Sequence, residues 1–258
     1  MTLGKRLTRK LALALPLAAL LSLVPAAAWA APPPALPAAA PEADRTWQPA
    51  LDFDTDGCYS TPAIGPDGTL NGGLAMGGTV NGQCRDLSDL QSTNVYSRSK
   101  CNNGWCAYLY GYYFEKDQVS WGPGSAGHRH DWEHIIVWVQ DGHARYMSVS
   151  QHSGYQIKPE SELQFEGGTH PKAVYHKDGG STHCFRFPKT GGGDEPPENH
   201  EGVWQVKGLV GWDNYPAGIR DRLVAADFGA ATFKLTDARF GNALATGKPA
   251  GVSLDPYA

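Results

Sequence analysis

The sequence has little of what a membrane-spanning protein requires. Its longest apolar stretch, residues 11–24, is too short for a comfortable membrane span and contains Pro16. Four basic residues precede this stretch, and Ala-Trp-Ala at residues 28–30 follows it with the small residues of a cleavage site. These features predict a signal peptide over residues 1–30 and a protein secreted to the extracellular space.

The chain also lacks an excess of positive charge. Its formal net charge is −4, and the first thirty residues carry four basic and no acidic side chains, so the remainder carries −8. Binding to a phosphate backbone needs a basic face, which argues against a nucleic-acid partner. The same balance is compatible with attracting a cation.

Cysteine is scarce, with five residues in 258. Cys58 and Cys84 bracket a glycine-rich segment, whereas Cys101 and Cys106 bracket Asn-Asn-Gly-Trp, which turns tightly enough to bring two sulfurs together. We predict the disulfides Cys58–Cys84 and Cys101–Cys106, although spacing alone does not exclude other pairings. This leaves Cys184 either as a buried, inert thiol or, as the alternative, in an intermolecular disulfide.

Helix signals are few, and the distribution of turn-forming residues along the chain is typical of a β protein. There are 31 glycines and 19 prolines, many of them between short runs of aromatic and β-branched residues. Residues 108–114 predict a strand, and Asp-Gly at 141–142 predicts a hairpin between residues 133–140 and 143–151. Further strands are predicted at 173–176, 182–187, 204–206 and 231–235, and short helices at 86–93 and 217–226.

These signals predict a mainly β fold with a simple organisation. Residues 31–45 are almost entirely alanine and proline, which predicts a disordered linker. Residues 46–258 are long enough for one β-sandwich domain with a few peripheral helices.

The strongest functional signal is Gly-His-Arg-His-Asp-Trp-Glu at residues 127–133, which runs into the apolar residues 135–139. Imidazoles beside carboxylates are what a divalent cation or a proton-transfer site requires. On a regular strand, His128 and Asp131 point to opposite faces, so a shared site needs a turn near residues 127–131. Glu133 alternates with the apolar residues that follow, where a carboxylate is costly unless it is paired or binds a cation.

Several uses of this cluster remain open from the residues alone. The non-functional interpretation is that these polar residues form the solvated edge of a strand. His128 and His130 on alternate positions are compatible with zinc, whereas the carboxylates favour Ca²⁺ or Mg²⁺. A hydrolase with Glu133 or His130 as base is a further alternative. A serine nucleophile is weakly supported, because no Gly-x-Ser-x-Gly element surrounds Ser125.

The heptapeptide at 127–133 resembles the signature of the necrosis- and ethylene-inducing peptide 1-like proteins, the NPP1 family. Residues 108–117, with their four tyrosines and terminal Lys-Asp, resemble a further segment of that family. So do residues 71–74, 170–179 and 216–221. The pair Cys101/Cys106 is similar to the family's second, four-cysteine type.

This resemblance implies an actinoporin- or lectin-like β-sandwich and a secreted cytolysin that is monomeric in solution and is not an enzyme. It implies a divalent cation, Mg²⁺ or Ca²⁺, used to recognise glycosyl inositol phosphorylceramide, a sphingolipid head group of plant plasma membranes, before membrane damage. A plant immune receptor is a further partner implied by the family. The implied metal ligands are Asp117, His128, Asp131 and Glu133, and the implied pocket or head-group residues are Arg129, His130 and His183.

The sequence departs from the family at two places. Residues 120–126 lengthen the segment between Asp117 and His128, and residues 177–180 lack the tryptophan that many plant-toxic members carry before Thr-His. A non-toxic, lectin-like glycolipid-binding protein is therefore an alternative to the cytolysin.

Overall fold

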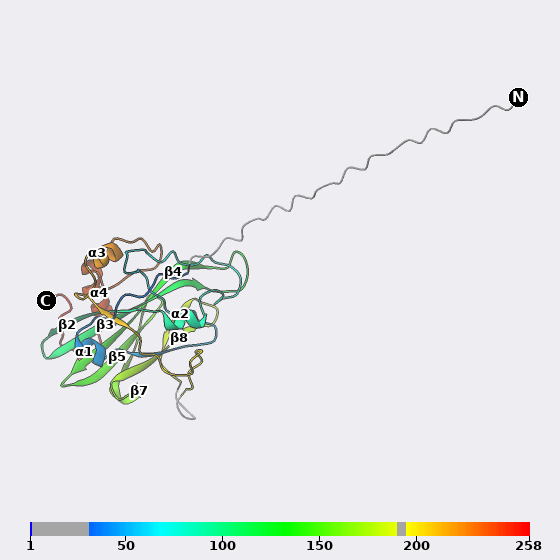
Figure 1. Ribbon diagram of the computed structural model, residues 1–258. Coiled ribbons are helices and arrows are strands. Elements are labelled where there is room, and N and C mark those ends of the chain that lie inside the picture. The colour runs from blue at the N-terminus through cyan, green and yellow to red at the C-terminus, as the bar shows by residue number, and fades with distance from the viewer. Residues whose placement is uncertain (2–30, 190–194) are drawn as a thin grey trace.

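Two β-sheets packed face to face form the body of the molecule in a computed structural model (Figure 1). The structure describes residues 1, 31–189 and 195–258. The predicted signal peptide thus lies almost wholly outside the described residues. The mainly β fold class and the β-sandwich architecture are confirmed.

The larger sheet has six strands and carries the long hairpins. All neighbours along it are antiparallel except the first pair, in which a C-terminal strand lies parallel to its partner. Its spatial order is β10 (Leu209–Gly211), β2 (Val95–Asn102), β3 (Trp105–Gln118), β4 (Gly127–Gln140), β5 (His143–Gln151) and β6 (Gly154–Pro159).

The smaller sheet is built around β8 (His170–Lys177). This strand pairs in parallel with β1 (Ala50–Phe53) and antiparallel with β7 (Phe165–Glu166) and β9 (His183–Arg186). The parallel pair joins segments more than a hundred residues apart, so no hairpin signal in the sequence marks it.

The helices are short and peripheral, as predicted. Of those in the described residues, α3 (Ile219–Val224) and α4 (Asp237–Gly247) lie near each other, away from β7 (Figure 1). The others are α1 (Glu42–Thr46), α2 (Leu87–Gln91) and the 3₁₀ turn η1 (Glu160–Glu162). No helix among the described residues is long and apolar enough to cross a membrane.

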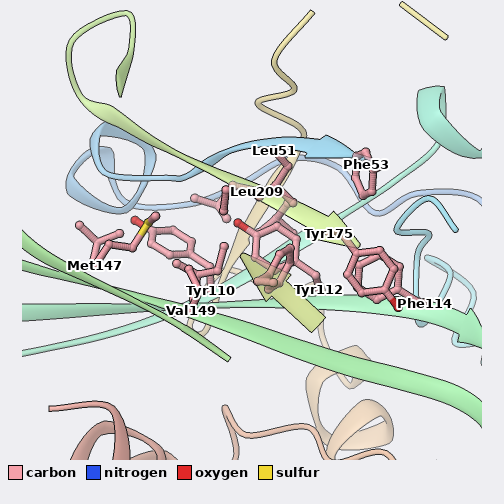
Figure 2. Close-up of a cluster of buried hydrophobic side chains, with 14 of the residues drawn as sticks. Leu51, Phe53, Tyr110, Tyr112, Phe114, Met147, Val149, Tyr175 and Leu209 are labelled. Atoms are coloured by element: carbon pink, nitrogen blue, oxygen red, sulfur yellow. The ribbon is translucent and has the colours of Figure 1, made fainter. Parts of the chain in front are cut away.

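The large sheet is buried on both faces. One face packs on the small sheet, and Figure 2 shows Tyr110, Tyr112 and Phe114 between the strands of the large sheet and the layer formed by β1 and β8. Ring stacking of Phe114 on Tyr175, with centroids 3.7 Å apart, joins the two layers. The other face packs on α3, α4 and the C-terminal segments through residues such as Trp138.

This double burial explains why β3 is apolar or aromatic at almost every position from Trp105 to Phe114. Tyr110 and Tyr112 enter the core between the sheets, whereas Leu109 and Tyr113 enter the core under the helices. A strand covered on both faces loses the polar alternation of a half-exposed strand. The aromatic run in the sequence therefore marks the centre of the sandwich.

The disulfide prediction is confirmed. Cys58 is bonded to Cys84 and Cys101 to Cys106. The second pair lies directly opposite on β2 and β3, where the residues between them form the connecting turn. Cys184 is a free and buried thiol.

The prediction of a disordered linker over residues 31–45 is wrong. Leu36 is 3% exposed, and its backbone N–H donates to Asn94 Oδ1 at 2.7 Å while its carbonyl accepts from Asn94 Nδ2 at 3.0 Å. Ala39 forms a β-bridge to Val210, and α1 begins at Glu42. An Ala/Pro composition predicts disorder only where no neighbour supplies contacts, and here the large sheet supplies them.

Two predicted strands are not formed, and some observed elements were not predicted. Residues 231–235 form no strand and instead cross the second core with Phe233 and Leu235. Residues 204–206 contribute only a single bridge, between Gln205 and Leu51. The strand β2 and the helix α4 were not predicted, because the sequence of β2 turns polar halfway along and α4 contains Gly241.

Candidate metal and head-group site

The site is built where β3 and β4 pair. The register runs from Cys106 opposite Val139 to Gln118 opposite Gly127, and it sets Asp117 opposite His128. Asp117 Oδ2 lies 3.9 Å from His128 Nε2. Antiparallel pairing thus joins a carboxylate and an imidazole that are eleven residues apart in the chain.

A left-handed residue brings Asp131 to the same side. His130 has a φ of +61°, a conformation uncommon for a residue with a side chain. It interrupts the alternation of the strand, so that His128 and Asp131 share a side although they are three residues apart. The turn predicted within residues 127–131 is not formed: these residues belong to β4, and the left-handed residue His130 takes its place. Ligand atoms of Asp117, His128 and Asp131 all lie within 4.8 Å of one another.

These three residues line a cavity of about 190 Å³. Glu133 and His183 also line it, so five of the seven predicted site residues meet there. The remaining lining residues come from β4, β5, the turns after β5 and β8, and the segment before α4: Trp132, Ser150, His152, Thr182, Ala230, Ala231, Thr232 and Lys234.

Arg129 and His130 do not line the cavity. Arg129 donates from Nη1 to the carbonyl of Gly72 at 3.0 Å. The His130 ring contacts the hydroxyl of Tyr113 at 2.6 Å and packs edge-on against Phe228. Burial, and next the Arg129 charge, lower the pKa of His130. Both side chains therefore support β4 from outside the cavity, and the backbone of His130 contacts a residue that lines the cavity.

His128 is oriented by that backbone. Its Nδ1 lies 2.6 Å from the carbonyl oxygen of His130, which only accepts, so Nδ1 carries the proton. Nε2 then presents its lone pair on the side of Asp117. An imidazole held by a carbonyl at one nitrogen and open at the other is the usual arrangement of a metal-ligating histidine.

Each carboxylate is held by one oxygen. Asp117 Oδ1 accepts from the backbone N–H of His183 at 2.9 Å and from its Nδ1 at 2.7 Å. Asp131 Oδ2 accepts from the Tyr175 hydroxyl at 3.1 Å, and Glu133 Oε2 accepts from the Ser150 hydroxyl. Because these bonds occupy a single oxygen of each group, the other oxygen is available to a cation.

The electrostatics of the site favour a bound cation. Burial raises the pKa of Asp131 to about 7, and the neighbouring Asp117 carboxylate contributes to this rise. Burial and the Asp131 charge also raise the pKa of Glu133 well above its ordinary value. Buried like charges of this kind are stable in the ionised form only with a compensating cation.

Lys234 brings an amine to the wall of the cavity, and the sequence did not predict it there. Burial lowers its pKa, against the opposing effect of Glu133. Its backbone N–H donates to His134 Nε2 at 3.2 Å, across a hundred residues of chain. No local pattern signals Lys234, Thr182 or Thr232, whereas Ser150 follows from the predicted hairpin that pairs β4 with β5.

As candidate cation ligands, the arrangement therefore offers three carboxylates and the imidazole of His128 around a small polar cavity. Oxygen donors with one nitrogen suit Ca²⁺ or Mg²⁺. The hydroxyls of Thr182 and Thr232 and the amine of Lys234 belong to other parts of the wall, where a polar ligand on the cation would meet them.

Comparison with known proteins yields one family. Residues 41–247 match the family model described as necrosis inducing protein (NPP1). NLP effector protein 10 of Phytophthora capsici is 32% identical over 196 residues, which cover 74% of this chain and 76% of that protein.

Solved structures agree with this match. A structure of NLPPya in complex with mannosamine superposes with a TM-score of 0.66 at 31% identity, and covers 83% of this chain and 95% of that one. A crystal structure of the non-toxic HaNLP3 protein superposes with a TM-score of 0.71 at 26% identity, and covers 86% and 99%.

Proposed function

The chain belongs to the necrosis inducing protein (NPP1) family, and on this premise we propose that it is a secreted protein that binds a divalent cation and, through it, sphingolipid head groups of plant membranes, which it then damages. The observation that carries the proposal is the convergence of Asp117, His128, Asp131 and Glu133 on one polar cavity. We place the chain in the four-cysteine type of the family, which its two disulfides support.

The four residues act as ligands of Ca²⁺ or Mg²⁺. Asp117, His128 and Asp131 are close enough to share one ion. Glu133 lies on the same wall, and its carboxylate is held by Ser150 on one oxygen. Protein ligands on one side of the ion leave positions for hydroxyls of a sugar on the other.

The cavity suits a glycosylated head group. A cation polarises sugar hydroxyls, and Thr182 and Thr232 add hydroxyl groups around it. His183 contributes to the pocket by holding Asp117. The complex of the similar protein NLPPya with mannosamine supports a sugar as the ligand here. The partners are glycosyl inositol phosphorylceramides of the plasma membrane and a plant immune receptor, and the protein acts as a monomer before it meets the membrane.

Calorimetric titration of the mature chain with Ca²⁺ and with Mg²⁺ tests the cation site. Asp117→Asn and Glu133→Gln keep the size of each side chain and remove its charge. Each substitution is expected to lower the affinity for the ion by at least about tenfold. Asp141→Asn is the matched control, because Asp141 is exposed in the turn between β4 and β5. Equal affinity in all four proteins contradicts the site.

Vesicle assays test recognition and damage separately. Vesicles that contain glycosyl inositol phosphorylceramide are expected to bind the protein and to release a trapped dye, and EDTA is expected to abolish both. Vesicles of phosphatidylcholine and sterol are the control. Binding that persists in EDTA contradicts a cation-mediated mechanism.

A non-toxic, lectin-like binder is the second candidate. The loop at residues 177–180 lacks a tryptophan, and the similar HaNLP3 protein is described as non-toxic. Head-group binding without dye release decides for this candidate. A metal-dependent hydrolase predicts instead that head group is consumed and that Glu133→Gln stops its turnover, which assays of the same vesicles detect.

A further inference from the structure

A second group of metal-ligating side chains lies beside the cavity. His152 stands in the turn between β5 and β6, Asp178 follows β8, and Cys184 is on β9. Ligand atoms of the three residues all lie within 4.8 Å of one another. His152 Nε2 and Asp178 Oδ2 are 2.9 Å apart.

The donors differ in kind from those of the oxygen-rich cavity. A sulfur, an imidazole nitrogen and a carboxylate oxygen form a borderline-soft set, which suits Zn²⁺ and disfavours Ca²⁺ and Mg²⁺. Zn²⁺ bonds of about 2.0–2.3 Å in tetrahedral geometry place ligand atoms about 3.3–3.7 Å apart. Small side-chain shifts bring the present atoms to those separations, because two of the three side chains are exposed at turns.

We propose that His152, Asp178 and Cys184 form a second metal site, for Zn²⁺ or a similar transition metal, which ties the turn after β5 to the loop after β8. Three protein ligands leave one position of the ion open. A further donor beside Cys184 is His176, whose Nε2 lies 3.7 Å from Cys184 Sγ and which pairs directly with Cys184 across β8 and β9.

Cys184 is a free, buried thiol whose proton a metal ion would displace on binding. It is 0% exposed, so the intermolecular disulfide considered from the sequence has no access to it in this fold. Burial raises the pKa of its thiol to about 12, and the carboxylates nearby act in the same direction. A bound metal ion supplies the positive charge that a thiolate needs in such surroundings.

Metal at this site would shape the rim of the first cavity. His152 and Thr182 line that cavity, and Thr182 Oγ1 lies 3.3 Å from His152 Nδ1. An ion that bridges His152 and Asp178 therefore holds in place the loop that carries Thr182 and precedes His183. The metal site itself does not depend on the proposed lipid-binding function.

Cobalt(II) is the direct probe. Four of the five cysteines are in disulfides, so every sulfur-to-cobalt charge-transfer band reports Cys184. We expect the mature chain, in excess Mg²⁺ that fills the oxygen-rich cavity, to take up one Co²⁺ with this band and with intense tetrahedral ligand-field bands. Zn²⁺ is expected to displace the cobalt.

Variants locate the ion. Cys184→Ser is expected to abolish the sulfur-to-cobalt band. Asp178→Asn and His152→Gln are each expected to lower the affinity for Co²⁺ by at least about tenfold. Because Asp178 and His152 are exposed, these two variants test the site even if Cys184→Ser fails to fold. His143→Gln and Asp213→Asn are the matched controls, because both residues are exposed and neither belongs to the cluster.

The two metal sites fail independently. Asp131→Asn is expected to lose Ca²⁺ and Mg²⁺ while it keeps the cobalt band. A wild-type chain with no sulfur-to-cobalt band, or a band that survives Cys184→Ser, overturns the proposal whatever the cavity binds.

Discussion

His183 holds Asp117 by two hydrogen bonds to a single oxygen, one from its backbone and one from its ring. The other ring nitrogen lies 3.2 Å from the carbonyl of Asp56, and the ring stacks on Tyr175. The second oxygen of Asp117 is thereby kept on the side of His128. A residue 66 positions away thus orients a carboxylate of the proposed cation site.

We expect His183→Ala to lower the affinity for Ca²⁺ or Mg²⁺ by about 10–100-fold, because Asp117 loses the partner that orients it. Calorimetry on the variant measures this directly, and circular dichroism shows that the sandwich remains. His170→Ala is the control, since His170 also bonds a carbonyl, that of Gln48, but lies off the cavity. Unchanged affinity in His183→Ala would mean that Asp117 is positioned without it.

Asp131→Asn is expected to stabilise the cation-free protein while it abolishes cation binding. A carboxyl whose folded pKa is raised to about 7 costs stability as the pH rises from its unfolded value of 3.8, and the full cost is present above pH 7. Removal of this charge should therefore raise the unfolding free energy at pH 8 by roughly 1–3 kcal/mol.

Thermal unfolding in EDTA and in Ca²⁺ measures both effects. Ca²⁺ should raise the melting temperature of the wild type and leave that of Asp131→Asn unchanged, because only a protein that binds the ion gains stability from it. A variant that melts lower than the wild type in EDTA would contradict the electrostatic argument.

Trp121 is expected to take part in membrane contact. Its side chain is 75% exposed on the loop between β3 and β4, the two strands that carry Asp117 and His128. Tryptophan partitions into the interface between lipid and water. Trp121→Ala should lower the vesicle-bound fraction several-fold with no change in cation affinity. Trp105 is buried and therefore offers the membrane no comparable contact. Equal binding to vesicles would remove this loop from the membrane-facing surface.

The ion pairs around Arg186 predict a loss of stability in acid. Arg186 bonds both oxygens of Glu195, and these bonds, with that from the Lys189 N–H, lower the pKa of Glu195 to about 2. The stabilisation is complete above the unfolded pKa of 4.5 and is lost as the pH falls toward 2.

Glu195→Gln should therefore cost about 1–2 kcal/mol at pH 7 and flatten the decline of stability between pH 4.5 and 2. Urea unfolding at several pH values measures this. Glu162→Gln is the control, because the Lys158–Glu162 pair is more exposed and 3.7 Å long. A surface pair of that kind contributes less than about 1 kcal/mol, so equal effects in both variants would contradict the prediction.

The segment before α1 is expected to contribute to stability as part of the fold. The side chain of Leu36 is buried, and its backbone N–H and C=O both bond to the side chain of Asn94. Leu36→Ala should therefore lower the free energy of unfolding by about 2–4 kcal/mol. Ala35→Gly, at the neighbouring position, controls for backbone effects. A loss below about 0.5 kcal/mol would show that the segment does not add to stability in solution.

Features encoded by neighbouring residues were predicted correctly. The hairpin β4–β5, the strand β3 and both disulfides follow from turn residues, runs of aromatic residues and the spacing of the cysteines. The cluster of donors around His128 also follows, because a left-handed residue within the motif is enough to bring Asp131 beside it.

The tertiary structure decided which distant groups complete each site. Parallel pairing of β1 with β8 and the contacts of β9 bring His183 to Asp117, and the segment before α4 brings Lys234 to Glu133. The same layers set Cys184 beside His152 and Asp178, and they order the Ala/Pro segment that its composition alone predicts to be disordered. Sequence by itself determined the sandwich and the donor residues of the candidate cation site, because these depend on local periodicity and side-chain chemistry. The walls of the cavity and the second metal cluster depend on packing between sheets, where the partners are many residues apart and leave no local pattern.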